Sequence, residues 1–239
     1  MPRLTLLRDD DPPEDFPDPE QALDDPNGLL ALGGDLSPPR LLAAYRRGIF
    51  PWYEDGQPIM WWSPDPRAVL LPGGLHVSRS LRRTLRSGRF MVSTDRDFAG
   101  VIGACAQLRA TEGTWITADM RDAYLRLHAL GHAHSIETWH DNRLVGGVYG
   151  IAIGKVFFGE SMFSTETDAS KVALTALMQQ LAGRSFGLLD CQLETPHLNS
   201  LGSRLMARRD FIRVVSDLGG IPDPAGGWQT GPRPTRELF

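Results

Sequence analysis

The chain has 239 residues and a formal net charge of −4 at pH 7, which suits one main domain with a small attachment and a substantial core. No apolar run approaches the ~20 residues that a membrane-spanning helix needs, and the acidic N-terminal stretch lacks the basic and then apolar order of a signal peptide. We therefore expect a cytoplasmic protein without a membrane partner.

The N-terminal part begins with an acidic arm and continues into a helix. Residues 1–35 hold ten Asp and Glu but two Arg, and residues 8–25 are rich in Asp and Pro, which predicts a loose surface arm. The helix is predicted to start after Ser37, a residue type that caps helices, with Pro38 in its first turn, and to end at Gly48.

Residues 49–67 are dense in proline and aromatic residues. Two interpretations are open for the aromatic side chains: a platform on which nucleobases stack, or the core of a proline-rich mini-domain, which is the more common use of tryptophan. We place a domain junction near Asp65, with a small N-terminal domain at 1–65 and the main domain at 66–239. The aromatic residues are Phe50, Trp52, Tyr53, Trp61 and Trp62.

A positive patch follows at residues 76–109, which hold seven Arg against two Asp. Such a cluster favours phosphate groups, but it also occurs on ordinary solvated helix faces, and the pattern alone leaves both interpretations open. Four of these Arg recur at three- and four-residue spacing after Ser78, so we expect them on one side of a short helix: Arg79, Arg82, Arg83 and Arg86.

The middle of the chain alternates strands and helices. We predict a strand at residues 90–93, a helix at 98–107, a second helix after residues 114–117, and a strand at 133–140. The apolar positions of the second helix follow the helical period, and Gly131 closes it.

Histidine and cysteine give no metal or disulfide framework. His132, His134 and His140 share one parity. A His-x-His pair can hold zinc, but no third or fourth ligand occurs at a recognisable spacing, so we expect no metal. Cys105 and Cys191 lie singly in apolar surroundings and are expected to be buried thiols.

The central stretch reads as a hairpin followed by a helix and a third strand. The hairpin strands are predicted at 144–153 and 156–164, because a glycine first in the Gly154-Lys155 loop suits a II′ turn. An amphipathic helix follows, ended by Gly183. A second basic cluster and a largely irregular tail are expected beyond the third strand. The inward positions of the helix are Ala173, Leu174, Leu177, Met178 and Leu181.

Polar residues interrupt these apolar strands. Glu160 lies in the return strand of the hairpin. Asp190 and Gln192 lie in the third strand, residues 188–193, and their spacing of two predicts that both side chains share one sheet face. Polar groups inside apolar strands suggest a functional site.

The order strand, strand, helix, strand is what an acyltransferase of the N-acetyltransferase type would look like. Enzymes of that type that use acetyl-CoA hold its pyrophosphate with a Gln/Arg-x-x-Gly-x-Gly/Ala loop at a helix N-terminus. The corresponding stretch here, STETDASK at residues 164–171, has no glycine and two acidic residues. An anionic CoA donor would be poorly held, so we expect no cofactor.

Many segments between residues 26 and 211 match one family. On these motifs the chain resembles the leucyl/phenylalanyl-tRNA–protein transferases, and the agreement spans most of the chain. The acidic arm and the tail beyond residue 211 lie outside it. The matching segments are PNGLLALGGDLSP, YRRGIFPW, WWSPDPRAV, LHVSRSLRR, TWIT, LGHAHSIE, LVGGVYG, FFGESMFS, ASK, DCQ, and SLG before ARRDF.

The resemblance implies an α/β (α+β) fold in which an N-acetyltransferase-like (GNAT-like) C-terminal domain follows a small N-terminal domain. It implies that Leu or Phe moves from aminoacyl-tRNA to the α-amino group of proteins with N-terminal Arg or Lys, which marks them for degradation by the N-degron pathway. Arg79, Arg83 and Arg86 then bind tRNA. An RNA donor also explains the missing CoA loop.

By the same resemblance, Asp190 and Gln192 are catalytic candidates, with Glu160 beside them. The aminoacyl ester is already activated, so the enzyme mainly positions an uncharged amine and helps its proton leave, which Asp190 could do through a hydrogen-bonded Gln192 amide. Glu160, or Asp190 with it, could also pair with the cationic acceptor side chain. The sequence does not separate these roles, and a buried structural Asp190–Gln192 pair is the alternative.

The donor side needs an apolar pocket for Leu or Phe and a surface for the terminal adenosine. Trp52 and Trp115 are the candidates for adenosine contact. An apolar pocket separates side chains that differ by a methylene by only about 1–3 kcal/mol, so leakage toward methionine is expected. The candidates for the pocket are Val148, Met162, Leu177 and Leu189.

Two other classes of protein stay open. An acyl-CoA-dependent N-acetyltransferase would bind acetyl-CoA and need no tRNA, but the missing glycine loop argues against it. A non-catalytic RNA-binding protein would bind tRNA and transfer nothing, but it gives no reason for polar residues in the strands.

Overall fold

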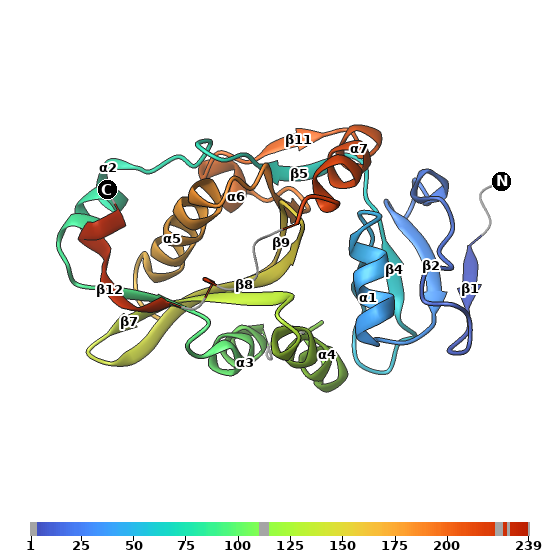
Figure 1. The fold of residues 1–239 in the computed structure, drawn as a ribbon, viewed down its shortest axis with the longest axis horizontal. Helices are drawn as coiled ribbons and strands as arrows, with labels where there is room; N and C mark the ends of the chain where they lie inside the picture. The colour runs from blue at the N-terminus through green and yellow to red at the C-terminus, as the bar shows by residue number, and fades with distance from the viewer. Residues whose placement is uncertain (1–3, 110–114, 223–226, 229, 239) are drawn as a thin grey trace.

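The computed structural model describes residues 4–109, 115–222, 227–228 and 230–238. The structure is mixed α/β, with a four-stranded and an eight-stranded sheet. The small sheet lies at the end of the molecule where the chain begins, and the large sheet forms the main body (Figure 1). Among the described residues, no helix is long and apolar enough to cross a membrane.

The small sheet has the order β1-β2-β4-β3, and helix α1 (Pro38–Tyr45) lies between it and the main body (Figure 1). The helix begins as predicted, but Ser37 makes no capping bond through its side chain. The backbone N–H of Ser37 instead donates to the Asp35 carboxylate at 2.6 Å. The strands are β1 (Thr5–Leu7), β2 (Leu29–Gly33), β3 (Phe50–Pro51) and β4 (Met60–Trp62).

The acidic arm is docked on α1, so the prediction of a loose surface arm is wrong. Arg40 donates to the backbone oxygen of Asp11 at 2.7 Å, and Arg47 donates to that of Phe16 at 2.7 Å. The Phe16 ring is buried edge-on against Trp61, with ring centres 4.9 Å apart. The two Arg satisfy backbone carbonyls that the arm cannot pair by itself, which its composition does not reveal.

The large sheet has the order β11-β5-β10-β9-β8-β7-β6-β12. Its neighbouring strands are antiparallel except β9 and β10, which are parallel and joined through helix α5 (Ala169–Gly183). Parallel neighbours need such a crossover. The strands are β5 (Arg67–Leu70), β6 (Met91–Thr94), β7 (Ala133–His140), β8 (Arg143–Ile153), β9 (Val156–Ser164), β10 (Leu188–Gln192), β11 (Arg204–Met206) and β12 (Thr230–Pro234).

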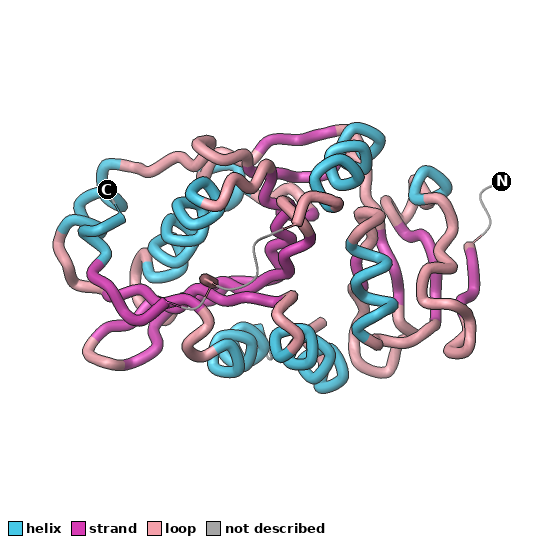
Figure 2. The backbone as a smooth tube through the Cα atoms, viewed as in Figure 1, coloured by secondary structure: helices cyan, strands magenta, loops and turns pink. Residues whose placement is uncertain are grey.

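Helices cover both faces of the large sheet (Figure 2). Helix α5 packs on one face against β7, β8 and β9, and its five predicted inward residues are all buried. Helices α3 (Phe98–Arg109) and α4 (Ala118–Ala129) pack on the other face. The remaining helices are α2 (Arg79–Arg86), α6 (Pro196–Ser200), α7 (Arg208–Gly219) and the short 3-10 turns η1 (Pro19–Gln21) and η2 (Thr235–Leu238).

The β8–β9 hairpin forms where the sequence predicts it. Gly154 has φ +56° at the first turn position, a conformation that costs glycine nothing sterically. A bulge at Gly150 interrupts the pairing, and a Cβ there would lie 2.1 Å from the backbone oxygen of Phe158. The predicted strand at 133–140 is confirmed, and Thr117 caps α4.

The prediction of a largely irregular tail is wrong in part. Strand β12 pairs with β6 and extends the large sheet. Trp228 is buried, with its ring stacked on His134 at 4.0 Å. The Pro- and Gly-rich composition predicts irregular backbone. Pairing with the edge of β6 and the contact of Trp228 with His134 order this part of the tail instead.

The predicted domain junction near Asp65 falls in the connection between the two sheets. Strand β4 ends at Trp62 and β5 begins at Arg67. The division into domains 1–65 and 66–239 stays a prediction.

Candidate active site

A pocket of about 360 Å³ lies where β9 and β10 of the large sheet meet β3 of the small one. The residues predicted for catalysis and donor binding line it, with one exception. Those that do are Trp52, Trp115, Val148, Glu160, Met162, Leu189, Asp190 and Gln192.

The exception is Leu177, which is buried within the core rather than on the pocket wall. Leu174, one helical turn earlier on α5, faces the pocket instead. The helical period correctly places both residues on the inward side of α5. It cannot tell which turn of the helix lies against the pocket.

Asp190 is paired with Arg67, a residue that the sequence analysis did not select. Both side chains are fully buried, and two bonds join them: Arg67 Nε to Oδ1 at 2.8 Å and Nη2 to Oδ2 at 2.6 Å. The guanidinium lies between the rings of Phe50 and Phe211, 4.7 and 4.5 Å from their centres. The sequence does contain one indication of Arg67, which is a charged residue at the start of the apolar strand RAVL.

Gln192 lies at a bulge rather than in a regular strand. Asp190 is opposite Val69 and Gln192 is opposite Ala68, so Cys191 is an extra residue and the spacing of two does not set the side-chain directions. Gln192 has φ +58°, in the left-handed region. Its backbone N–H, not its side-chain amide, donates to Asp190 at 3.0 Å. The expected Asp190 bond to the Gln192 side chain is therefore not formed.

Glu160 is the carboxyl group that the Gln192 side chain contacts. Gln192 Nε2 donates to Glu160 Oε1 at 3.3 Å. Tyr45 Oη lies 2.8 Å from Oε1, and Tyr124 Oη lies 2.9 Å from Oε2. Burial raises the pKa of Glu160 to about 7, although the two tyrosine hydrogen bonds act in the opposite direction. Tyr45 joins the site from α1, beside the small sheet.

The aromatic residues of the proline-rich segment divide between core and pocket. Phe50, Tyr53 and Trp61 are buried, as the core interpretation predicts. Trp52 is 41% exposed on the pocket wall and packs edge-on against Trp62, with ring centres 5.6 Å apart.

Cys191 lines the pocket, whereas Cys105 is buried as predicted. Burial raises the pKa of the Cys191 thiol to about 12, with Asp190 as a second cause. The nucleophilic form of cysteine is the thiolate. Cys191 is therefore protonated near neutral pH and is not placed to act as a nucleophile.

The predicted arginine helix is confirmed as α2. Ser78 caps it by accepting from Leu81 N at 3.2 Å, and Leu81 and Leu85 are buried. The structure gives none of the four predicted Arg an acidic partner within the described residues. These four exposed side chains line a shallow groove: Arg79, Arg82, Arg83 and Arg86.

The second basic cluster is not one surface. Arg208 is buried and donates to the backbone oxygen of Ser63 at 2.8 Å. Arg204, Arg209 and Arg213 are exposed. These four arginines share a charge, but one is buried and three are exposed, so they do not form a single basic surface.

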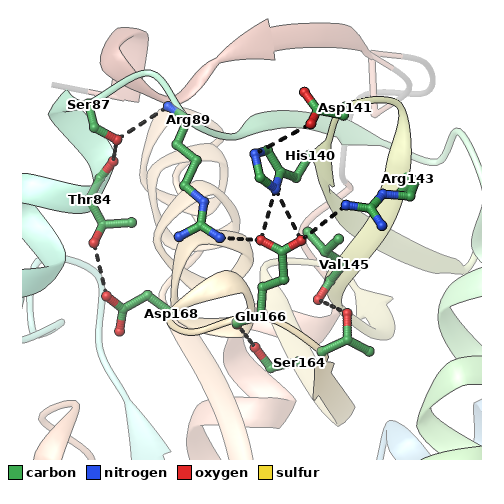
Figure 3. Close-up of polar contacts among 11 residues, drawn as sticks. Thr84, Ser87, Arg89, His140, Asp141, Arg143, Val145, Ser164, Glu166 and Asp168 are labelled. Atoms are coloured by element: carbon green, nitrogen blue, oxygen red, sulfur yellow. Dashed lines mark hydrogen bonds and ion pairs between the residues drawn. The ribbon is translucent and has the colours of Figure 1, made fainter.

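The loop before α5 carries two carboxylates (Figure 3). Glu166 accepts from His140 Nδ1 at 2.9 Å and from Arg89, and the His140 hydrogen bond lowers the pKa of Glu166. Asp168 accepts from Thr84 Oγ1 at 2.9 Å, which ties the loop to α2. Anionic side chains thus lie next to the N-terminal end of α5.

The three histidines of the predicted parity set do not converge. His134 pairs with Asp95 at 2.7 Å, and His140 pairs with Glu166. In the described parts of the chain, no group of three or more His, Cys, Asp or Glu side chains could hold a metal ion.

The pocket therefore combines an apolar wall with a buried acid, which is typical of a site that holds an apolar group next to a polar one. Residues 69–216 match the family model for leucyl/phenylalanyl-tRNA protein transferase, and residues 34–65 match the model for its N-terminal domain. The chain belongs to the leucyl/phenylalanyl-tRNA protein transferase family.

Individual relatives agree with this membership. A leucyl/phenylalanyl-tRNA–protein transferase of Aromatoleum aromaticum is 63% identical over 90% of this chain and 91% of its own. One from Stutzerimonas stutzeri is 56% identical over 89% of this chain and 94% of its own. The solved structure of L-PGS from Bacillus licheniformis is 10% identical, with a TM-score of 0.35 over 70% of this chain and 53% of its own, a likeness too low to bear on the fold.

Proposed function

We propose that this protein transfers Leu or Phe from aminoacyl-tRNA to the α-amino group of proteins with N-terminal Arg or Lys. Family membership supports the reaction. The observation that carries the assignment to this pocket is the placement of Glu160 beside an apolar wall that includes Met162 and Leu189. The wall suits a Leu or Phe side chain, and the acid suits a cationic acceptor.

We assign the acceptor side chain to Glu160 alone. Asp190 is completely buried, and both of its oxygens already bond to Arg67, so it offers no free charge to a substrate. Glu160 borders the pocket and forms no ion pair with a cation among the described residues. This choice narrows the two carboxylate roles that the sequence leaves open.

Gln192 then positions the attacking amine. Its Nε2 donates to Glu160, which leaves its amide oxygen to accept a hydrogen bond from the α-amino group. The amine nitrogen attacks the carbonyl carbon of the ester, the bond between that carbon and the ribose oxygen breaks, and the amine proton passes to the leaving ribose oxygen. A neutral amide is no base, so catalysis here is mainly orientation. Asp190 and Arg67 position Gln192 by fixing the bulge of β10.

On the donor side, Trp52 and Trp115 bind the terminal adenosine, and the apolar wall binds Leu or Phe. The wall comprises Val148, Met162, Leu174 and Leu189. Arg79, Arg83 and Arg86 bind tRNA phosphates, because their side chains are exposed on one groove without acidic partners. The product is a protein marked for degradation by the N-degron pathway, and the reaction takes place in the cytoplasm, where aminoacyl-tRNA is made.

We further propose that residues 66–239 form an N-acetyltransferase-like domain behind a small N-terminal domain at 1–65. The parallel pair β9–β10, joined by α5 within an otherwise antiparallel sheet, supports this. An acyl-CoA donor is disfavoured, because Glu166 and Asp168 place negative charge where pyrophosphate would bind (Figure 3).

The test is transfer itself. The protein is incubated with labelled Leu-tRNA and a peptide that begins with Arg, and the same peptide with an acetylated N-terminus is the control. Label on the free peptide but not on the acetylated one is expected. No label on either peptide, or acetylation of the free peptide from acetyl-CoA, would contradict the proposal.

A further inference from the structure

Three oxygen–oxygen contacts form a closed ring around Glu160. Tyr45 Oη lies 2.8 Å from Glu160 Oε1, and Tyr124 Oη lies 2.9 Å from Oε2. The two tyrosine oxygens lie 2.6 Å apart. Both tyrosines are fully buried. Each contact has the length of an O–H···O hydrogen bond, and each such bond needs one proton.

Two phenol groups supply only two protons for these three contacts. Ionising a tyrosine would remove another, and burial together with Glu160 raises the pKa of both phenols well above the usual value. If Glu160 were ionised, one of the three contacts would have no proton: either the two tyrosine oxygens, 2.6 Å apart, or one tyrosine oxygen and the carboxylate oxygen next to it. A carboxyl proton on Glu160 completes the ring in either direction, and Oε1 can still accept from Gln192.

The other charges near this ring cancel. Arg67 and Asp190 form a paired unit with no net charge. A neutral Glu160 therefore leaves the whole buried cluster uncharged, which avoids the cost of an unpaired buried charge. The groups that act on Glu160 from other elements are Tyr45 of α1, Tyr124 of α4, Arg67 of β5, and Asp190 and Gln192 of β10. Tyr149 of β8 acts on the two tyrosines.

We propose that Glu160 is protonated in the empty enzyme, held so by Tyr45 and Tyr124 as positioning residues, and that a cationic acceptor side chain ionises it with release of one proton to solvent. The second half rests on the proposed function. On ionisation both tyrosines donate to the carboxylate, and their own oxygens must move apart. The positive charge of the acceptor side chain then takes the place of the proton on Glu160, and this exchange is how the acceptor is recognised.

Infrared difference spectroscopy tests the first half without any substrate. The empty protein should show the carbonyl stretch of a protonated carboxylic acid at a pH below 7, and Glu160→Gln should lack it. Burial also raises the pKa of Glu137, so Glu137→Gln is the matched control and should keep the Glu160 band. If Glu160→Gln does not fold, a shift of the band in Glu137→Gln on labelling with ¹³C-glutamate shows that it comes from a Glu side chain other than Glu137, and its loss on binding of a peptide with N-terminal Arg assigns it to the pocket.

The second half uses two acceptor peptides that differ only in charge. A peptide with N-terminal Arg should abolish the Glu160 band, whereas the same peptide with citrulline, its uncharged analogue, should leave it. No protonated-acid band from Glu160 in the empty protein would overturn the proposal, whatever the protein transfers. A band that persists with bound Arg peptide, in a protein that transfers Leu normally, would overturn the ionisation step and leave the proposed function intact.

Discussion

Arg67 and Asp190 form a buried ion pair, and we propose that this pair positions Gln192 rather than contacting substrate. The pair is bidentate, and the Asp190 carboxylate also accepts the backbone N–H of Gln192. A buried pair of this kind does not by itself imply high stability, because desolvation offsets much of the attraction. Removing one partner is costly, since it leaves the other charge buried and unpaired.

Arg67→Met should therefore lower the free energy of unfolding by about 3–5 kcal/mol, as measured by urea denaturation. The double variant with Asp190→Asn should recover part of this loss, because the stranded charge is gone. Arg213→Met is the control, since Arg213 is 65% exposed in a surface pair with Asp210, and it should change stability by less than about 1 kcal/mol. A loss from Arg67→Met no larger than that of the control would contradict the described pair.

Glu160 should make stability depend on pH in a defined direction. Its folded-state pKa is raised from 4.5 to about 7, so its protonated form favours folding. The contribution is fully present below pH 4.5 and is lost as the pH rises to about 7. The raised pKa corresponds to roughly 3 kcal/mol.

The measurement is the unfolding free energy of wild type and Glu160→Gln across this window. Wild type should lose up to that amount relative to the variant, because the uncharged amide does not titrate. A difference between the two proteins that stays constant with pH would show that Glu160 titrates normally.

At the scale of elements, the β10 bulge sets the direction of the Gln192 side chain. Gln192 occupies the left-handed backbone region, which Asn also tolerates. Gln192→Asn should thus keep the stability of the fold, but its amide is one methylene too short to hold the contact with Glu160. Transfer should fall by about 10²-fold, the usual cost of misplacing a group by ~1 Å.

Steady-state transfer and thermal unfolding, measured on the same Gln192→Asn preparation, separate the two effects. Gln192→Gly relieves the backbone and removes the amide, and it should lose at least as much activity. Full activity in both variants would show that the amide has no part in the reaction.

The arginines of helix α2 should strengthen tRNA binding through their charge but should take no part in the transfer reaction. Replacing Arg79, Arg83 and Arg86 with Ala should weaken tRNA binding and flatten its dependence on the logarithm of salt concentration, by roughly 0.9 for each lost phosphate contact. Arg121 and Arg126, exposed on α4 on the far side of the molecule (Figure 1), provide the matched control. Their replacement should leave the slope unchanged.

Transfer from a minimal aminoacyl-adenosine donor should suffer little in the α2 variant, because that donor has no acceptor stem. Equal losses with tRNA and with the minimal donor would mean that the arginines support the fold instead.

The elements were more predictable than their contacts. The hairpin, helix α5 and the arginine helix follow from a turn glycine, from helical periodicity and from a capping Ser78. The β10 bulge did not follow, because strict alternation is the default for a short strand and nothing in DCQ signals the extra residue. The direction of the Gln192 side chain was therefore inferred from the wrong geometry.

At the scale of the whole molecule, residues far apart in the sequence build one site. Tyr45 comes from α1 beside the small sheet, and Tyr124 comes from α4 below the large one (Figure 1). Most of the catalytic and donor-binding residues that motifs and the family resemblance predicted do line the pocket. Motifs and resemblance did not identify Arg67 or the two tyrosines, because each of these residues acts through a partner that is far away in the sequence. Arg67 and Asp190 are more than a hundred positions apart, and Tyr45 and Tyr124 are about eighty positions apart.

The same limit explains the arm and the tail. Their Asp, Pro and Gly content predicts irregular chain, and local composition carries no record of a docking partner. Arg47, which bonds to the arm, and His134, which stacks on Trp228 of the tail, supply that partner from elsewhere in the fold.

The central claim is that Glu160 recognises the positive charge of the acceptor in the pocket that carries out transfer. The most direct measurement is the ratio of kcat/KM for peptides with N-terminal Arg and N-terminal citrulline, in wild type and in Glu160→Gln. A charged hydrogen bond of about 1.5–3 kcal/mol predicts that wild type prefers Arg by roughly 10- to 150-fold. Glu160→Gln should bring the ratio close to one, and an unchanged preference in that variant would contradict the account.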